Sequence, residues 1–138
     1  MVDLVRSDPG QGRCPCGSGA AFAACCSRLH RCETTAVTAE QLMRSRFSAF
    51  AVGDIAYLLS SWHPVTRPHH FSLDPDTRWT HLEVLETARG GALDAEGTVS
   101  FVAHSERRGQ PATQGEVSRF SRQDGRWVYV SPVGLATP

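Results

Sequence analysis

The sequence of 138 residues is notable first for what it lacks. It has no apolar run near the roughly 20 residues that a membrane-spanning helix needs, so we expect no membrane insertion. Its first residues, Met1 to Arg6, lack the apolar core of a secretory signal, which predicts a cytoplasmic protein. It has no lysine and no net charge, with 14 basic and 14 acidic residues, so binding to a nucleic-acid backbone is not expected.

The length sets the number of domains. A chain of this size can bury one hydrophobic core and a small satellite, and a hydrophobic content of 41% is ordinary for a globular protein. No internal repeat and no low-complexity tract is visible. We therefore expect one domain with a small appended unit.

Four cysteines are concentrated near the start of the chain. Cys14 and Cys16 are separated by eight residues from the adjacent pair Cys25 and Cys26. Thiolates at this density can surround a zinc ion in a tetrahedron with Zn–S distances of about 2.3 Å, and glycines let the backbone turn beneath it. The spacing predicts one metal ion bound by these four residues, and iron is an alternative because thiolate-rich sites accept it too.

Disulfides and redox chemistry are the competing interpretations of these thiols. Neither Cys14 with Cys16 nor Cys25 with Cys26 has comfortable disulfide geometry, so only cross-pairing between the couples is feasible. The expected reducing compartment also favours free thiols, and the spacing is not that of a Cys-x-x-Cys redox motif. Cys32 lies six residues beyond Cys26, and we interpret it as a bystander.

This segment resembles the SEC-C motif, a metal-binding knuckle found at the C-terminal tail of the SecA translocation ATPase and in small bacterial proteins. The residues that carry the resemblance are Cys14-Pro15-Cys16-Gly17-Ser18-Gly19 and Cys25-Cys26. Because the SecA knuckle docks on the SecB chaperone, the resemblance implies a protein partner, such as a SecB-type chaperone.

Helical signals follow the cysteines. Ala20 to Cys26 is rich in alanine and predicts one helical turn. Thr38 and Gln41 have the spacing of a capping box, and an apolar stripe with helical spacing follows them up to Gly53. Asp54 can cap a second, short helix. We expect the stripe to face the core rather than a ligand.

Strand signals follow the helices. Residues 66–77 predict an irregular segment, and residues 79–88, 97–105, 116–122 and 126–131 predict four strands. Gly90-Gly91 and Asp124-Gly125 are the predicted hairpin turns. Helices followed by an antiparallel meander indicate an α+β domain with the helices on one face of a curved sheet.

Nearly the whole chain resembles the YchJ family of small bacterial proteins. The resemblance is carried by residues 38–50, Tyr57-Leu58, Trp62-His63-Pro64, Arg67-Pro68, and the segments 97–103, 116–120 and 125–130. It implies a SEC-C knuckle over residues 1–34. It also implies, over residues 35–138, a cone-shaped α+β domain of the nuclear transport factor 2-like or cystatin-like type.

The interior of such a cone is a second candidate site. The candidate residues offer a titratable group, carboxylates, an anion clamp and large aromatic walls: His63, Glu83, Glu116, Arg119, Trp62 and Trp79. Arg44, Arg46 and Glu96 could contribute charge as well, whereas His30, His69 and His70 are expected to be solvated loop residues. A structural ion pair or a packing role is the ordinary alternative for each of them.

One departure from the family bears on this site. The family often has a histidine before the acidic residue that corresponds to Glu116, and this chain has Gly115. Because no nucleophile and base are paired in the sequence either, we expect no strong catalytic constellation. The favoured function is a metal-binding adaptor, and the alternative is a small-molecule binder or an enzyme of the isomerase or dehydratase type, although a fold alone does not assign a function.

Overall fold

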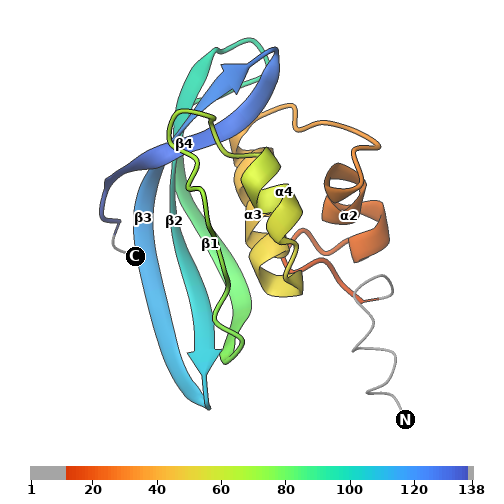
Figure 1. Ribbon diagram of the computed structural model, residues 1–138, viewed down its shortest axis with the longest axis vertical. Helices are drawn as coiled ribbons and strands as arrows, with labels where there is room; N and C mark the ends of the chain where they lie inside the picture. Colours follow the sequence, from red (N-terminus) through yellow and green to blue (C-terminus); the bar gives the residue numbers. More distant parts are fainter. Residues whose placement is uncertain (1–11, 137–138) are drawn as a thin grey trace.

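The computed structural model describes residues 12–136, with helices first and strands after (Figure 1). The helical elements are η1 (Phe22–Ala24), α2 (Cys26–His30), α3 (Ala39–Val52) and α4 (Ile55–Ser60), and the strands are β1 (Thr77–Arg89), β2 (Glu96–Arg107), β3 (Gln110–Gln123) and β4 (Arg126–Gly134). The strands form one antiparallel sheet in the order β1-β2-β3-β4. The predicted α+β fold with a curved sheet is confirmed. None of the described helices is long and apolar enough to cross a bilayer.

The boundaries of α3 and α4 follow from their capping residues. The hydroxyl of Thr38 accepts a hydrogen bond from the backbone N–H of Gln41 (3.1 Å). At the other end Gly53 adopts a left-handed conformation (φ 80°), which terminates the helix. The carboxylate of Asp54 then accepts from the N–H of Tyr57 (2.9 Å) and begins α4.

The strands are longer than the sequence pattern predicts, chiefly in β3. The predicted turn at Asp124 and Gly125 is present, with φ values of 54° and 81°. A turn of the same type at Arg108 and Gly109 (φ 53° and 82°) was not predicted. It joins β2 directly to β3, so β3 begins at Gln110 rather than at Glu116.

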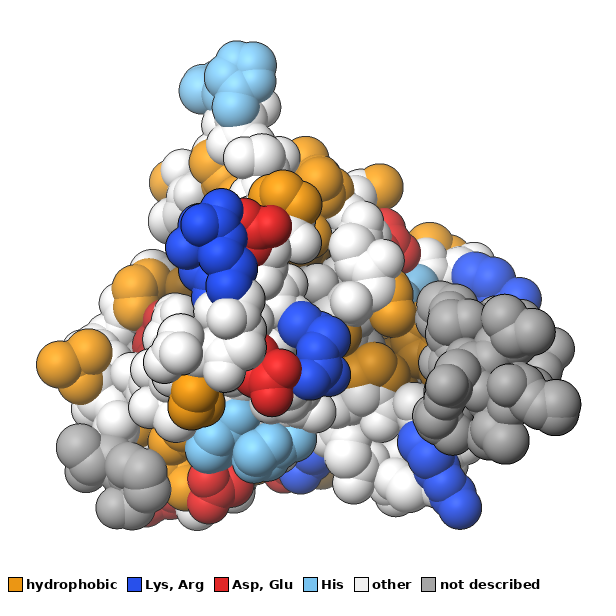
Figure 2. All heavy atoms as spheres, turned by 90° about the horizontal axis from the view of Figure 1, so that it is seen from below, with side chains coloured by type: hydrophobic (Ala, Val, Ile, Leu, Met, Phe, Trp, Pro, Cys, Tyr) orange, Lys and Arg blue, Asp and Glu red, His pale blue; other side chains and the backbone are white. Residues whose placement is uncertain are grey.

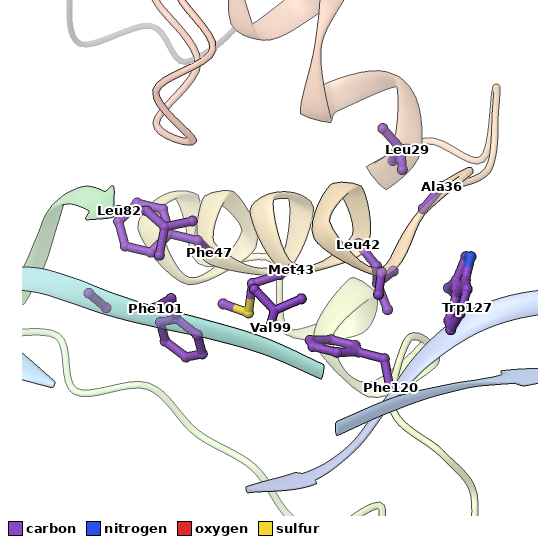
Figure 3. Packing of buried hydrophobic residues seen from close by; sticks show 12 residues of the cluster. Leu29, Ala36, Leu42, Met43, Phe47, Leu82, Val99, Phe101, Phe120 and Trp127 are labelled. Atoms are coloured by element: carbon purple, nitrogen blue, oxygen red, sulfur yellow. The ribbon is translucent and has the colours of Figure 1, made fainter. Parts of the chain in front are cut away.

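The main hydrophobic core lies between α3 and the concave face of the sheet. Figure 3 shows Leu42, Met43 and Phe47 of α3 pointing toward the sheet. They meet side chains from all four strands, among them Leu82, Val99, Phe101, Phe120 and Trp127. The indole N–H of Trp127 also donates to the backbone oxygen of Val37 (3.0 Å), which ties β4 to the segment before α3.

The opposite side of α3 is also covered. In Figure 1, α3 lies between the sheet and α2, and Figure 3 shows the same order of layers. Ser45, Ser48 and Ala49 on α3 have 0% of their surface exposed. Their small side chains let the N-terminal segment approach the helix closely, so the middle of α3 is a central layer rather than a surface helix.

Two glycines bring the β1–β2 hairpin against the start of α3. A Cβ atom built on Gly97 would lie 2.4 Å from the Cα of Gly90. Gly90 in turn accepts a hydrogen bond from the N–H of Ala39 through its backbone oxygen (2.9 Å). The hairpin end and the helix therefore fit together only while position 97 has no side chain.

We expect Gly97→Ala to lower the free energy of unfolding by about 1–3 kcal/mol, because the added methyl group forces the backbone of residue 90 to move. Urea denaturation of the purified variant measures this. Gly134→Ala is the matched control in β4, since no atom lies within 4 Å of its built Cβ. Equal stability of the two variants would contradict the prediction.

Candidate functional site

The cysteine segment forms a tight loop. Arg13 and Ala21 pair as an antiparallel bridge, and the N–H of Cys14 donates to the backbone oxygen of Ala20 (2.8 Å). Gly17 and Gly19 have φ values of 85° and 88°, a region that side chains strongly disfavour. The loop can thus reverse direction within a few residues and bring the first two thiols under the chain that follows.

The second pair of thiols comes from the junction of two helical elements. Cys25 lies between η1 and α2, and Cys26 is the first residue of α2. The expected single helical turn before Cys26 is therefore a short 3₁₀ helix, Phe22–Ala24, followed by a new α-helix. This break turns both side chains back toward Cys14 and Cys16.

The four sulfur atoms form one compact group. The Sγ atoms of Cys14, Cys16, Cys25 and Cys26 all lie within 4.8 Å of one another, and all four thiols are free. Cys16 Sγ and Cys25 Sγ are 3.7 Å apart. Tetrahedral coordination with Zn–S distances of about 2.3 Å requires sulfur atoms about 3.8 Å apart, so the donor set fits a tetrahedral metal ion. The group is positioned for metal binding.

Neighbouring groups hold the sulfur atoms in place. The hydroxyl of Ser48, on α3, lies 3.4 Å from Cys14 Sγ, and that of Ser18 lies 3.2 Å from Cys25 Sγ. The guanidinium of Arg44 donates to the backbone oxygen of Cys16 (2.8 Å). Such outer contacts orient ligands and offset negative charge on the sulfur atoms.

The thiols also affect each other's protonation. Hydrogen bonding from Cys16 lowers the pKa of Cys14, with a further contribution from Cys26. The same shared bonds raise the pKa of Cys16 and of Cys26, with burial adding to the effect. Four thiolates side by side repel one another, so full deprotonation of the group needs a cation among them.

The knuckle is packed against α3. Leu29 of α2 and Ala36 belong to the main core, and Val52 of α3 packs against the cysteine cluster. Within residues 12–34 of the predicted unit 1–34, Leu29 therefore joins the main core, while the cysteines and Phe22 form a second cluster beside α3. Residues 1–11 and 137–138 lie outside the described part of the chain.

His30 is a correction to the sequence analysis, which expected a solvated side chain. Its side chain is only 5% exposed, and its Nε2–H donates to the backbone oxygen of Ser45 on α3 (2.8 Å). Its ring also packs against that of Tyr57 in a tilted arrangement, with ring centres 4.5 Å apart. The end of α2 lies against α3, so the ring of His30 is buried there. The charge and polarity of histidine alone did not predict this contact. Cys32 is exposed and outside the sulfur group.

A cavity of about 190 Å³ lies on the other side of α3. We call it the cone cavity. Its walls come from α3, the segment after α4 and all four strands: Met43, Arg46, Phe47, Phe50, Trp62, Trp79, Phe101, Ala103, Gln114, Glu116, Ser118 and Tyr129. Of the candidate residues from the sequence, it brings together Trp62, Trp79 and Glu116, and also Arg46.

The other three candidate residues lie elsewhere. His63 is on the loop after α4, where its backbone N–H donates to Tyr129 O and its Nδ1 accepts from Val65 N. Glu83 lies on the outer face of the sheet and contacts His104 (3.1 Å). Arg119 is exposed on the same outer face. These residues cannot act together with Glu116 in one pocket in this structure.

Gly115 also faces away from the cone cavity. Gln114, Glu116 and Ser118 of β3 line the cavity, so position 115 alternates to the outer face. A Cβ atom built there would lie 2.0 Å from the backbone oxygen of Ala136. The glycine therefore allows the C-terminal segment to cross the sheet, and its lack of an imidazole has no bearing on the cavity.

Arg46, Tyr129 and Glu116 are the titratable residues of the cavity, and Gln114 and Ser118 are its other polar residues besides Trp62. Arg46 is 3% exposed, and its guanidinium lies over the rings of Trp62 (5.0 Å) and Tyr129 (4.7 Å). Burial lowers the pKa of Arg46 to about 10 and raises that of Tyr129 to about 12. Tyr129 is not among the candidates from the sequence, because a predicted strand over residues 126–131 does not indicate which of its faces meets the cavity.

Comparison with known proteins agrees with this architecture. Residues 38–132 match the YchJ middle NTF2-like domain, and residues 13–28 match the SEC-C motif. A solution structure of a SEC-C motif containing protein from Rhodopseudomonas palustris superposes with a TM-score of 0.76 at 30% identity, covering 91% of this chain and 98% of that one. The molecule is thus a SEC-C protein in which the motif is joined to a nuclear transport factor 2-like cone.

Curated relatives make the assignment narrower. A UPF0225 protein of Streptomyces coelicolor is 53% identical over 116 residues, which is 84% of this chain and 90% of the relative. A UPF0225 protein of Chromobacterium violaceum is 50% identical over 122 residues, covering 86% and 90%. The chain belongs to the UPF0225, or YchJ, family.

Proposed function

We propose that the protein is a zinc-dependent adaptor of the cytoplasm, in which the metal-bound knuckle presents a docking surface to another protein. The observation that carries the proposal is the position of the sulfur group. Cys14, Cys16 and Cys26 are buried, whereas Cys25 is half-buried and lines an open groove between the knuckle and the first turns of α3. Loss of the metal would therefore remove the groove itself.

Zinc is the proposed metal because the donor set is four cysteine sulfurs at tetrahedral spacing, the arrangement of structural zinc sites. Iron is the alternative for the same ligands, and supply in the cell decides between the two. In either case Cys14, Cys16, Cys25 and Cys26 would hold the ion. Elemental analysis of protein purified from its native cytoplasm distinguishes zinc from iron.

The groove and its rim carry arginines. Arg28 and Arg44 line it beside the sulfur group, and Arg31 is close by with 59% of its side chain exposed. Glu33 pairs with Arg31 (3.0 Å) and more loosely with Arg28 (3.9 Å), so the two arginines share one carboxylate. Elsewhere charges of both signs are interspersed, as on the face drawn in Figure 2. An acidic segment of a protein partner fits this rim by charge.

A SecB-type chaperone is the proposed partner class, because the SEC-C motif of SecA docks on SecB. A contact of this kind is small and rests on exposed charges, so we expect transient, salt-sensitive binding rather than a permanent complex. No contact with nucleic acid is proposed, since the chain has no net charge.

We expect immobilised, zinc-loaded protein to bind a purified SecB-type chaperone, and Arg28→Gln with Arg31→Gln to weaken binding about tenfold because two of the three arginines of the groove and its rim are removed. Biolayer interferometry at low and high salt measures the affinity, and elemental analysis verifies that the double variant still holds its metal.

Two further proteins complete this experiment. Arg119→Gln removes an exposed arginine from the outer face of the sheet and serves as the matched control, with unchanged binding expected. Cys25→Ser with Cys26→Ser should abolish binding together with metal content. If the arginine double variant bound as tightly as the Arg119 variant, recognition would not lie at the knuckle.

A further inference from the structure

The cone cavity contains a buried cation that forms no ion pair in the described part of the chain. Arg46 is 3% exposed, and one of its terminal nitrogens donates to the backbone oxygen of Leu58 (2.8 Å) and to the hydroxyl of Ser61 (2.7 Å). Both acceptors are neutral. Among residues 12–136 no carboxylate forms an ion pair with it. A guanidinium carries five N–H donors, so these two contacts leave most of its hydrogen-bonding capacity unused, and Glu116 is the one acidic residue among the residues that line the cavity.

A second donor in the same wall is unused. The indole N–H of Trp62 is buried and has no hydrogen-bond partner, the one such side-chain atom in the described part of the chain. Trp62 lines the cone cavity, and its ring packs against the guanidinium of Arg46. A buried donor left unpaired costs about 1–3 kcal/mol, which an acceptor in the cavity would recover.

The carboxylate that lines the same cavity, Glu116, is hydrogen-bonded to other groups. Glu116 accepts hydrogen bonds from the hydroxyl of Ser118 and from that of Tyr129 (3.4 Å), both on neighbouring positions of the sheet. The cavity therefore has two chemically different ends. Arg46 and the Trp62 indole offer donors, and Glu116 offers an acceptor on the side of the sheet.

The walls between the two ends are mostly aromatic. Phe47, Phe50, Trp79 and Phe101 line the cavity together with the rings of Trp62 and Tyr129. The volume of about 190 Å³ is below the roughly 300–1,000 Å³ of pockets for drug-sized ligands. The space suits a molecule of about one ring.

We propose that the cone cavity is a binding site for a small aromatic carboxylate. The carboxylate would accept hydrogen bonds from the free N–H groups of Arg46 and from the indole N–H of Trp62, while its ring lies among the aromatic walls. A hydroxyl or amino substituent on the ring could donate to Glu116. This site is independent of the metal-binding knuckle and would operate on the opposite side of α3.

The experiment follows the three tryptophan indole signals in a nitrogen–proton correlation spectrum of the isotope-labelled full chain. Benzoate is the probe, its neutral analogue benzamide tests the charge, and benzylamine tests the opposite charge. We expect benzoate to bind with a Kd of about 1 mM, as suits so small a ligand, and to shift the indole signal of Trp62 downfield as its N–H gains an acceptor. The indole of Trp127 already donates to Val37 and should stay in place.

Benzamide should bind about tenfold more weakly than benzoate, and benzylamine should not shift the Trp62 signal. Trp62→Phe keeps a ring in the wall but removes the donor, and we expect it to weaken benzoate binding about tenfold, as measured on the Trp79 indole. Arg46→Gln should abolish binding, and Arg119→Gln on the outer face should leave it unchanged. Because Arg46→Gln could impair folding, Trp62→Phe and the wild-type spectrum decide the question without it.

Three results would contradict the proposal. One is a Trp62 indole signal that does not move even when the benzoate concentration is far above the expected Kd of about 1 mM. Another is binding of benzylamine as tight as that of benzoate, which would assign the cavity to cations through Glu116 and the aromatic rings. The third is equal binding of benzoate to the wild type and to Trp62→Phe, which would exclude the indole as part of the site.

Discussion

Removing the metal from the zinc-loaded protein is expected to destabilise the whole described fold, not the knuckle alone. Leu29 and Ala36 are part of the core that Phe120 and Trp127 share, and Cys26 begins the helix that carries Leu29. A structural zinc site contributes several kcal/mol or more to folding, so a chelator should lower the midpoint of thermal unfolding by more than about 10 °C. Calorimetry with and without chelator measures this, and one metal ion per chain should be released.

Chelation would have a different effect if the knuckle and the cone folded independently. If the knuckle were a separate unit, chelation would disorder residues before about Thr38 and leave the cone transition where it was. Cys32→Ser provides the matched control, because Cys32 is exposed and outside the sulfur group. It should retain both metal and unfolding midpoint, whereas Cys26→Ser should lose both. An unshifted cone transition after complete metal removal would refute the coupling.

Replacing Arg46 by alanine is expected to lower the free energy of unfolding by about 2–4 kcal/mol. The side chain donates to the backbone oxygen of Leu58 and the hydroxyl of Ser61, both at the end of α4, and its loss leaves these buried acceptors short of partners. It also ends the contacts of the guanidinium with Trp62 and Tyr129. Urea denaturation monitored by tryptophan fluorescence measures the change.

The control for Arg46→Ala is Arg119→Ala, which removes the same side chain from an exposed position of β3 and should change stability by less than about 0.5 kcal/mol. Burying the charge of Arg46 costs free energy as well, so the sign of the change in the free energy of unfolding shows which of the two effects is larger. A more stable Arg46→Ala protein would mean that the desolvation cost exceeds what its hydrogen bonds return.

The features that depend on local sequence were predicted well. The cysteine spacing located the sulfur group, because a loop of thirteen residues with two glycines in left-handed conformations leaves the thiols few arrangements. The capping residues Thr38 and Asp54 located the starts of α3 and α4. In each case the interaction that fixes the structure lies within a few residues of the signal.

The cavity residues were predicted less well, because strand faces depend on register. Trp79 and Glu83 stand four apart, so uninterrupted alternation would place them on one face. A bulge between Trp79 and His81 shifts the alternation, and Trp79 faces the cavity while Glu83 faces outward. Glu116 and Arg119 stand three apart in β3, so alternation alone already places them on opposite faces.

The packing of the knuckle on α3 had a weaker signal still. Serine and alanine at positions 45, 48 and 49 lie on the side of α3 opposite the apolar stripe, and on a surface helix they would face water. Here they are fully buried because the N-terminal segment covers them. No neighbouring residue in the sequence predicts this burial, because the residues that cover positions 45, 48 and 49 come close only after folding.

The hydrogen bond from Trp127 to Val37 spans 90 positions of the chain and has a consequence for the order of assembly. During synthesis the cysteines emerge first, and the short loop from Cys14 to Cys26 can close around an ion at little entropic cost. The layer that receives it is completed only when β4, the last strand, has been made. The four cysteines are thus made well before the last strand of the cone, so a segment that could bind a metal ion precedes the core against which it packs.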